Sequence, residues 1–259
     1  MILYKYVSFK GAVEIIKNSS IGFRGNMLLN DPFEGSYFGF EQGQDISPNL
    51  AMGAVRSRVA ANYALLSLTR QPHNSLMWAH YGDSHKGIVI GIDVEKAGFT
   101  DDEKSIVPIQ YGEVIYTSTK PKNRYAIPSQ RELMDVGRSA KFDANSYNLL
   151  KRAFLYKSLE WAYEEEVRVV KSITTDPYIS KGTYGKFENS SEKWNRIEVD
   201  NKPLDCFEIP RESIVSVHLG HYFDYENMKT VKDWSRNGID IISCKADLHS
   251  WDLVSSSVE

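Results

Sequence analysis

YALLSLT, residues 63–69, and GIVIGID, residues 87–93, flank a short helical segment, and together they indicate the class of fold. Both runs are rich in apolar residues over the length of one strand, which is typical of buried strands. Between them, Ser75 is placed to begin a helix that Gly82 ends. A strand, a helix and a second strand in one short stretch predict a domain in which helices pack on a sheet.

The flanking sequence continues this mixture without a regular repeat. We expect strands at 2–9, 106–117, 161–173, 214–219 and 239–243, and helices at 11–18, 49–60, 148–158 and 224–236. Because no series of strand–helix–strand units is visible, the expected class is α+β. The predicted architecture is one mixed, mainly antiparallel or split sheet flanked by helices.

The length of 259 residues and the apolar fraction of 42% fit one folded domain. We therefore expect a single α+β domain over residues 1–259. Its less regular parts are a connection near 118–147 and a polar segment near 172–203. Neither has the composition of a domain linker.

Charge and cysteine content restrict the classes of function. The formal net charge of −3 gives no general electrostatic attraction to nucleic acid. The two cysteines, Cys206 and Cys244, lack metal-type spacing and are too few for a disulfide framework. The sequence shows neither a signal peptide nor a membrane span, so we expect a cytoplasmic protein without a membrane partner.

The segment W-x-x-E-x-E-x-R contains Trp161, Glu164, Glu166 and Arg168. On a strand, the two carboxylates and the guanidinium share one face, each about 7 Å from the next. Arg168 can then orient one carboxylate while the other binds a ligand. A face of cross-strand ion pairs is the alternative interpretation of the same pattern.

A second candidate segment, 75–87, concentrates Trp78, His80, Tyr81 and His85 around a short helix. Aromatic rings and imidazoles suit stacking on a heterocyclic ligand and hydrogen bonding to it. The alternative is that Trp78 belongs to the core while the histidines cap backbone groups. The spacing of His73, His80 and His85 matches no ligand signature, so no metal is expected.

A third candidate is Asn30-Asp31-Pro32-Phe33-Glu34, which has the composition of a turn. Asn30, Asp31 and Glu34 can line a pocket, and the same residues can equally form a rigid corner. The sequence contains no G-x-S-x-G, no P-loop and no G-x-G-x-x-G. These absences weigh against a serine hydrolase, a nucleoside triphosphatase and a dehydrogenase.

In combination, four segments resemble the bacterial domain-of-unknown-function family 2971. They are 3–6, 30–34, 77–87 and 161–168, in that order along the chain. The resemblance implies little about activity, because the name of the family assigns none.

The sequence is also distantly similar to the ADP-ribosyltransferase superfamily. Its arginine-type members carry a basic residue on the first strand, Ser-x-Ser/Thr on a middle strand and Glu-x-Glu on a later one. Lys5, Ser67 with Thr69, and Glu164 with Glu166 occur here in that order. Two departures are a lysine in place of arginine or histidine, and Arg168 beside the carboxylates.

This second resemblance implies an ADP-ribosyltransferase-like fold and NAD as substrate. Glu166 would stabilise the charge that develops as nicotinamide leaves, and Glu164 would activate an acceptor that remains unidentified. The remaining residues of the implied NAD site are Lys5, Tyr6, Ser67, Thr69, Trp78, His80 and Tyr81. The implied activity is ADP-ribosyl transfer or NAD hydrolysis, as in a toxin or phage-defence effector.

A non-catalytic module that senses a small-molecule or nucleotide ligand, or that binds another protein, is the main alternative. It predicts that Glu164, Glu166 and Arg168 bind one another and Lys5 or His80. A phosphodiester enzyme that uses His80 or His85 with a carboxylate is a third reading, and the acidic net charge disfavours it.

Overall fold

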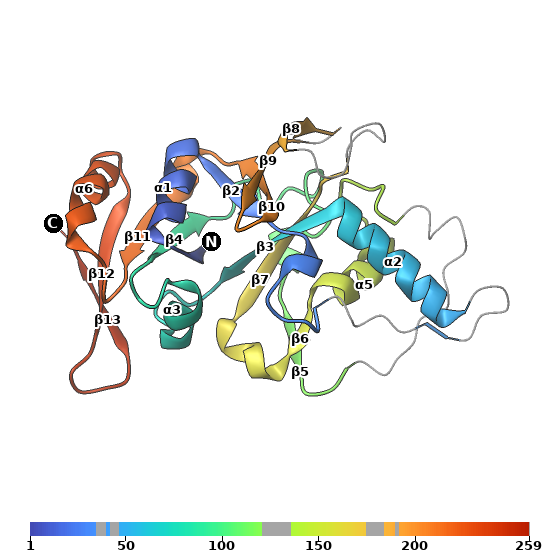
Figure 1. Cartoon of the computed structure of the whole chain (residues 1–259), viewed down its shortest axis with the longest axis horizontal. Coiled ribbons are helices and arrows are strands. Elements are labelled where there is room, and N and C mark those ends of the chain that lie inside the picture. The colour runs from blue at the N-terminus through green and yellow to red at the C-terminus, as the bar shows by residue number, and fades with distance from the viewer. Residues whose placement is uncertain (35–39, 42–46, 121–135, 175–183, 190–191, 259) are drawn as a thin grey trace.

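A computed structural model describes residues 1–34, 40–41, 47–120, 136–174, 184–189 and 192–258. A seven-stranded sheet runs through the molecule in the order β13-β12-β11-β4-β1-β3-β7 (Figure 1). Its strands are β1 Ile2–Val7, β3 Tyr63–Thr69, β4 Ile88–Asp93, β7 Glu166–Ser172, β11 Ile214–Leu219, β12 Asp240–Ala246 and β13 Leu253–Ser257. All neighbours are antiparallel except β11 and β12, so the predicted α+β class with a mixed, mainly antiparallel sheet is confirmed.

Two smaller sheets accompany the large one. The first has the order β2-β10-β9-β8, and the second pairs β5 with β6 in parallel. Their strands are β2 Ser20–Phe23, β5 Ile115–Thr117, β6 Tyr156–Ser158, β8 Gly185–Glu188, β9 Lys193–Val199 and β10 Lys202–Glu208. The prediction left a single or a split sheet open, and the strands of the described residues form three sheets.

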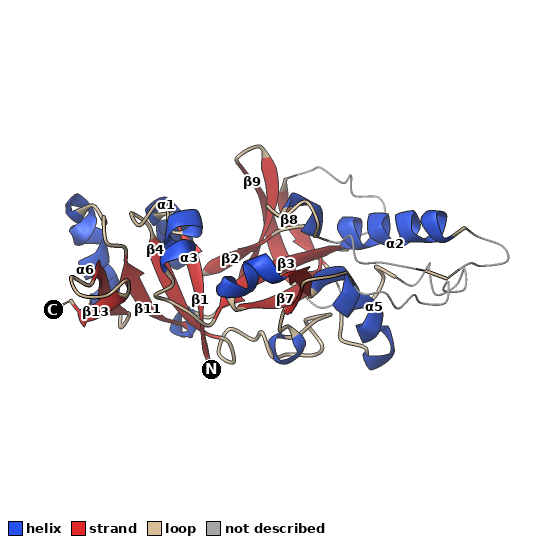
Figure 2. Ribbon diagram, turned by 90° about the horizontal axis from the view of Figure 1, so that it is seen from below, coloured by secondary structure: helices blue, strands red, loops and turns tan. Residues whose placement is uncertain are grey.

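Alternate residues of a strand point to opposite faces of its sheet. Both faces of the large sheet are covered. Leu66, Val167 and Val169 pack on one side with helices α1 (Phe9–Asn18) and α6 (Met228–Arg236) and with the four-stranded sheet. Leu65 and Val170 pack on the other side with α2 (Pro48–Asn62) and α5 (Ala144–Phe154). Helix α3 (Ser75–Tyr81) lies further along this second side, and Figure 2 shows the arrangement from below.

The predicted strands at 63–69, 87–93 and 214–219 occur almost as expected, and helix α3 does end at Gly82. The capping residue of this helix differs, because Asn74 rather than Ser75 accepts hydrogen bonds from the first backbone amides. Asn is as effective an N-cap as Ser, so the predicted start of the helix was correct to within one residue.

Four predicted segments differ from the structure, and one of them is the helix at 148–158, where α5 ends at Phe154 and Tyr156–Ser158 is strand β6. Residues 106–117 are mainly short 3-10 turn (Ile109–Tyr111) and isolated bridges, and only Ile115–Thr117 is a strand. The predicted strand at 161–173 begins at Glu166, because Leu159–Glu164 is a 3-10 helix. The polar segment 172–203 contains β8 and β9, which were not predicted. Residues 121–135, 175–183 and 190–191 of the two irregular segments lie outside the described residues.

Candidate functional site

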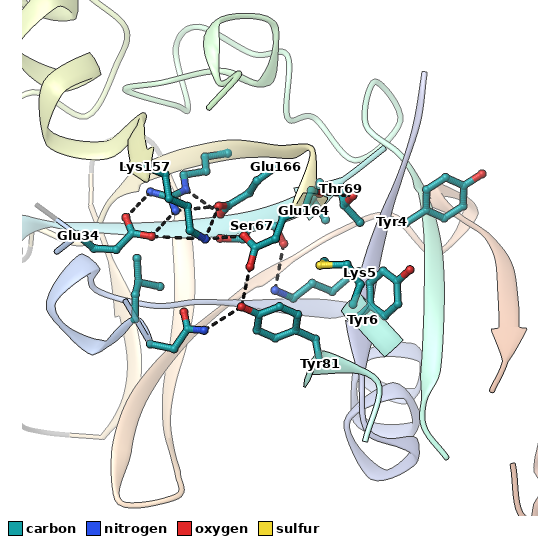
Figure 3. A pocket seen from close by; sticks show the side chains of 15 residues that line it. Tyr4, Lys5, Tyr6, Glu34, Ser67, Thr69, Tyr81, Lys157, Glu164 and Glu166 are labelled. Atoms are coloured by element: carbon teal, nitrogen blue, oxygen red, sulfur yellow. Dashed lines mark hydrogen bonds and ion pairs between the residues drawn. The ribbon is translucent and has the colours of Figure 1, made fainter. Parts of the chain in front are cut away.

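A cavity of about 160 Å³ lies beside the large sheet, and Figure 3 shows the side chains that line it. It lies where β1, β3 and β7 approach α3 and the 3-10 helix Leu159–Glu164. Fifteen residues line it: Tyr4, Lys5, Tyr6, Leu29, Asn30, Glu34, Ser67, Leu68, Thr69, Met77, Tyr81, Lys157, Glu164, Glu166 and Arg168. The three predicted motifs therefore contribute to one site.

Strand pairing places four of these residues side by side. In the antiparallel pair β3–β7, Ser67 lies opposite Arg168 and Thr69 lies opposite Glu166. Directly opposed residues point to the same face of a sheet. Glu166 and Arg168 thus share a face, as the sequence predicts.

Glu164 reaches the cavity by a different route. It is the last residue of the 3-10 helix, and Glu165 after it adopts a left-handed backbone with φ 43°. The Thr69 hydroxyl donates to the Glu164 carbonyl oxygen at 2.5 Å and fixes this junction to the end of β3. Glu164 and Glu166 therefore face one cavity without belonging to one strand.

A buried ion cluster forms one wall of the cavity. Arg168 donates to both carboxylate oxygens of Glu34, at 2.6 and 2.7 Å, and its Nε donates to Glu166 Oε1 at 2.7 Å. The Lys157 ammonium donates to Glu166 Oε2 at 3.1 Å and to Glu164 Oε2. All five side chains are at most 5% exposed. Such buried charges are stable only when each is paired and hydrogen-bonded, as here.

The two carboxylates differ in their electrostatic surroundings. Burial alone would raise the pKa of Glu166, but Arg168 and Lys157 together hold that pKa well below its usual range. Burial raises the pKa of Glu164 and outweighs the opposing effect of Lys157. Glu166 is therefore a permanent anion, whereas Glu164 is the carboxyl group with the greater tendency to take up a proton.

Lys5 has a different environment from the other two cations of the cavity. Its ammonium donates to the Ser67 carbonyl oxygen at 3.0 Å, and no carboxylate of the described residues lies within 4.0 Å of it. Burial lowers the pKa of Lys5 to about 8, against the attraction of Glu166. An ammonium has three donors, so two remain for other partners.

Tyr81 connects the turn at 30–34 to the carboxylates. The Asn30 side-chain amide donates to the Tyr81 hydroxyl at 2.8 Å, and this hydroxyl donates to Glu164 Oε1 at 2.7 Å. Together with Lys157, Tyr81 orients the carboxyl group of Glu164 toward the cavity (Figure 3). The turn itself is also the rigid corner expected, since Asp31 Oδ1 accepts from the Phe33 amide at 2.8 Å.

Several predicted site residues lie elsewhere. Trp78 is fully buried in the core, and its indole donates to the Pro72 carbonyl oxygen at 2.9 Å. His85 stacks on Trp78, and His80 is exposed beside Tyr81. The Lys157 ammonium lies 5.0 Å from the centre of the Trp161 ring. These residues support the fold around the cavity and do not line it.

Sequence reasoning missed Lys157, the central cation of the cluster. The residue lies on the short strand β6, within a segment that was predicted to be the end of a helix. The remaining missed lining residues are Tyr4, Leu29, Leu68 and Met77. The available signal was the position of this lysine between an apolar helical segment and W-x-x-E. A lysine that is buried there is expected to pair with a carboxylate.

The charged residues at 157–168 and the aromatic helix at 77–81 lie within the part of the chain that matches a family model. Residues 77–169 match the family model "Protein of unknown function (DUF2971)". This match includes two of the four segments on which the family resemblance rested, 77–87 and 161–168. It includes neither 3–6 nor 30–34.

Searches of curated proteins and of solved structures found no match. None of the three comparisons links the chain to ADP-ribosyltransferases. Within the described part of the chain, no helix combines the length and apolarity needed to cross a membrane.

Proposed function

We propose that the chain binds a small polar ligand in this cavity, with Lys5 as its principal contact. The observation that carries the proposal is the ammonium of Lys5, which lies against the cavity with two free donors and no carboxylate partner among the described residues. Lys5 is half-buried, and a charge that is partly withdrawn from water without a charged partner is costly in the protein alone. An oxygen atom of a ligand would supply that partner.

The opposite side of the cavity defines the rest of the ligand. Glu164 and Tyr81 present oxygen atoms there, and their orientation is fixed by Lys157 and Asn30. A ligand hydroxyl can donate to Glu164 while another of its oxygens accepts from Lys5. We therefore expect a ligand with several hydroxyl, carbonyl or anionic oxygens, such as a sugar or a carboxamide.

The volume of the cavity limits the size of the ligand. An apolar cavity of about 150 Å³ holds one benzene ring, and this cavity is of similar volume at about 160 Å³. One ring or one sugar fits within the described walls. A larger ligand would insert one end and leave the rest outside.

NAD cleavage is a second candidate, favoured by the arrangement of three strands. Lys5 on β1, Ser67 on β3 and Glu166 on β7 lie on neighbouring strands around one cavity, in the order that the ADP-ribosyltransferase resemblance implies. The nicotinamide group, one ring with an amide, is within the size limit. In hydrolysis the glycosidic C–N bond breaks, nicotinamide leaves with its electron pair, and water adds to the ribosyl carbon.

The ion cluster changes the roles that this candidate assigns to the two carboxylates. Glu166 is neutralised by Arg168 and Lys157, which reduces its ability to stabilise a developing positive charge. Glu164 has the raised pKa that suits a group taking the proton from the attacking water. In this candidate function Glu164 acts as general base and Glu166 as a positioning residue.

Amide spectra recorded by NMR with nicotinamide, ribose and NAD as separate probes test ligand binding. We expect millimolar ribose or nicotinamide to shift the signals of Lys5, Ser67 and Tyr81. The Lys5→Met variant should lose the shifts, whereas the matched variant Lys10→Met, which removes an exposed charge from α1, should keep them. Probes that leave these three signals unchanged in the wild type would contradict the proposal.

Nicotinamide release from NAD tests the second candidate. Release by the wild type should fall in Glu164→Gln and remain in Glu165→Gln, whose native carboxylate contacts Gln71 outside the cavity. Binding of the probes without any release would assign the cavity to ligand sensing and reject NAD cleavage.

A further inference from the structure

A second polar cluster lies apart from the ion cluster. His73, His218 and Cys244 each present one ligand atom, and these atoms all lie within 4.8 Å of one another. His218 and Cys244 are buried, and His73 is half-buried. None of the three lines the cavity described above.

The fold brings these residues together from three places in the sequence. His73 belongs to the connection between β3 and α3, and His218 and Cys244 lie on the parallel neighbours β11 and β12. Cys244 pairs directly with Ser255 on β13. The Ser255 hydroxyl is 2.5 Å from His73 Nε2 and 3.7 Å from the Cys244 sulfur. The cluster thus joins the β3–α3 connection to the far edge of the sheet.

The distances are close to those of a tetrahedral metal site. With bonds of about 2.0 to 2.3 Å to zinc, nitrogen and sulfur ligands lie roughly 3.3 to 3.7 Å from one another. The Cys244 sulfur is already 3.8 Å from His218 Nδ1. The other pairs, all within 4.8 Å, need to close by no more than about 1.5 Å. Small side-chain rotations provide such a movement.

The orientation of His218 also suits metal binding. Its Nε2 lies 3.4 Å from the Ser216 hydroxyl, so Nδ1 is the nitrogen that faces Cys244. Histidines that bind metals commonly donate from the second ring nitrogen to such a partner, which fixes the ring. Ser216 therefore occupies the position of an orienting residue.

We propose that His73, His218 and Cys244 bind one zinc ion. Two imidazoles and one thiolate are a donor set that favours zinc over magnesium or calcium, which prefer oxygen ligands. Water or the Ser255 hydroxyl completes the tetrahedron. Ser255 is exposed and His73 is half-buried, so the ion can enter from that side.

No metal is expected from the sequence, because the spacing of His73, His80 and His85 matches no ligand signature. Of His73, His80 and His85, only His73 belongs to the cluster, and the other two ligands come from the C-terminal strands. The ion would fix the connection that follows Thr69, a residue of the cavity lining, and that contains Gln71, whose carbonyl oxygen accepts from the hydroxyl of the lining residue Tyr6. The proposal stands independently of the ligand that the cavity binds.

Metal titration of the full chain tests the proposal. After treatment with a chelator, the protein should bind one Zn²⁺ per chain in competition with a chromophoric chelator. Co²⁺ in its place should give the visible bands of a four-coordinate ion and a near-ultraviolet band from thiolate to cobalt. The proposal would be overturned if the wild type failed to bind one Zn²⁺ per chain at a micromolar concentration of free zinc.

Matched variants locate the ion. His73→Gln, in a half-buried connection, and Cys244→Ser should each weaken zinc binding by at least about tenfold. Cys206→Ser, on β10, should bind zinc like the wild type, and so should Lys5→Met. Unchanged affinity in folded His73→Gln and Cys244→Ser, checked by circular dichroism, would show that these residues do not hold the ion.

Discussion

Arg168 and Glu34 form a two-pronged ion pair in the protein interior, although 134 residues separate them in the sequence. The guanidinium thereby ties the turn at 30–34 to strand β7. Without the Glu34 carboxylate, Arg168 keeps Glu166 as its partner but loses charge-assisted hydrogen bonds, which are worth about 1.5 to 3 kcal/mol each. We expect Glu34→Gln to lower the free energy of unfolding by about this amount in urea denaturation.

An exposed ion pair provides the control for this prediction. Arg236 and Asp233 interact at 3.0 Å on the surface of α6, and both side chains are more than half exposed. Asp233→Asn should change the free energy of unfolding by less than about 1 kcal/mol. Equal urea midpoints for Glu34→Gln and the wild type would show that Glu34 contributes little to stability.

Lys5 should make stability depend on pH in alkaline solution. Its pKa is about 8 in the folded protein, whereas the ordinary value of a lysine, 10.5, applies to the unfolded chain. Between these values the unfolded chain binds the proton and the folded chain does not, so the free energy of unfolding rises with pH. We expect Lys5→Met to remove this contribution from denaturation curves at pH 8 to 10.5, and Lys10→Met to retain it. The lowered pKa of Lys5 would be contradicted if the free energy of unfolding changed with pH in the same way in both variants.

Tyr81 should control the protonation of Glu164. The hydroxyl of Tyr81 donates to Glu164 Oε1, and this hydrogen bond favours the ionised carboxylate. Tyr81→Phe should therefore raise the pKa of Glu164 further, and cost about 1 kcal/mol of stability. Carboxyl carbon signals in an NMR titration measure the shift. Tyr222→Phe, an exposed tyrosine on another loop, should leave the titration unchanged.

Trp78 should act on stability and not on ligand contact. The side chain is fully buried and packs against Tyr6 with ring centroids 5.3 Å apart. Trp78→Ala should lower the free energy of unfolding by about 3 to 5 kcal/mol. The milder Trp78→Phe, in its folded form, should still give the ribose or nicotinamide shifts at Lys5 and Tyr81. Loss of those shifts with an intact fold would place Trp78 at the ligand.

The parts of the fold that the sequence predicted best are those that local patterns determine. Strands β3, β4 and β11 are short apolar runs, and burial of both faces leaves few alternatives for such runs. Strands β8 and β9 were missed because most of their side chains are polar and partly exposed. β9 pairs with β10 across the turn at Asp200 and Asn201, and β8 pairs with β9, so both strands are specified by their partners and not by an apolar periodicity of their own.

The candidate site was predicted in outline for a similar reason. Glu164, Glu166, Arg168 and Glu34 occur in dense polar motifs, which a sequence reveals. Their convergence with Lys157 depends on the short strand β6 and on the antiparallel register of β3 with β7. His73, His218 and Cys244 are separated so widely that no motif connects them, and only the sheet order does.

The left-handed backbone of Glu165 makes the spacing of the three consecutive glutamates critical. This residue joins a helical turn to a strand, and the side chains on either side of it face one cavity. A strand alternates its faces with every residue, so inserting or deleting one amino acid here would turn β7 over. Val167 would then face the ion cluster, and Arg168 would be driven into the apolar layer. Length changes at this position should therefore be far more damaging than substitutions.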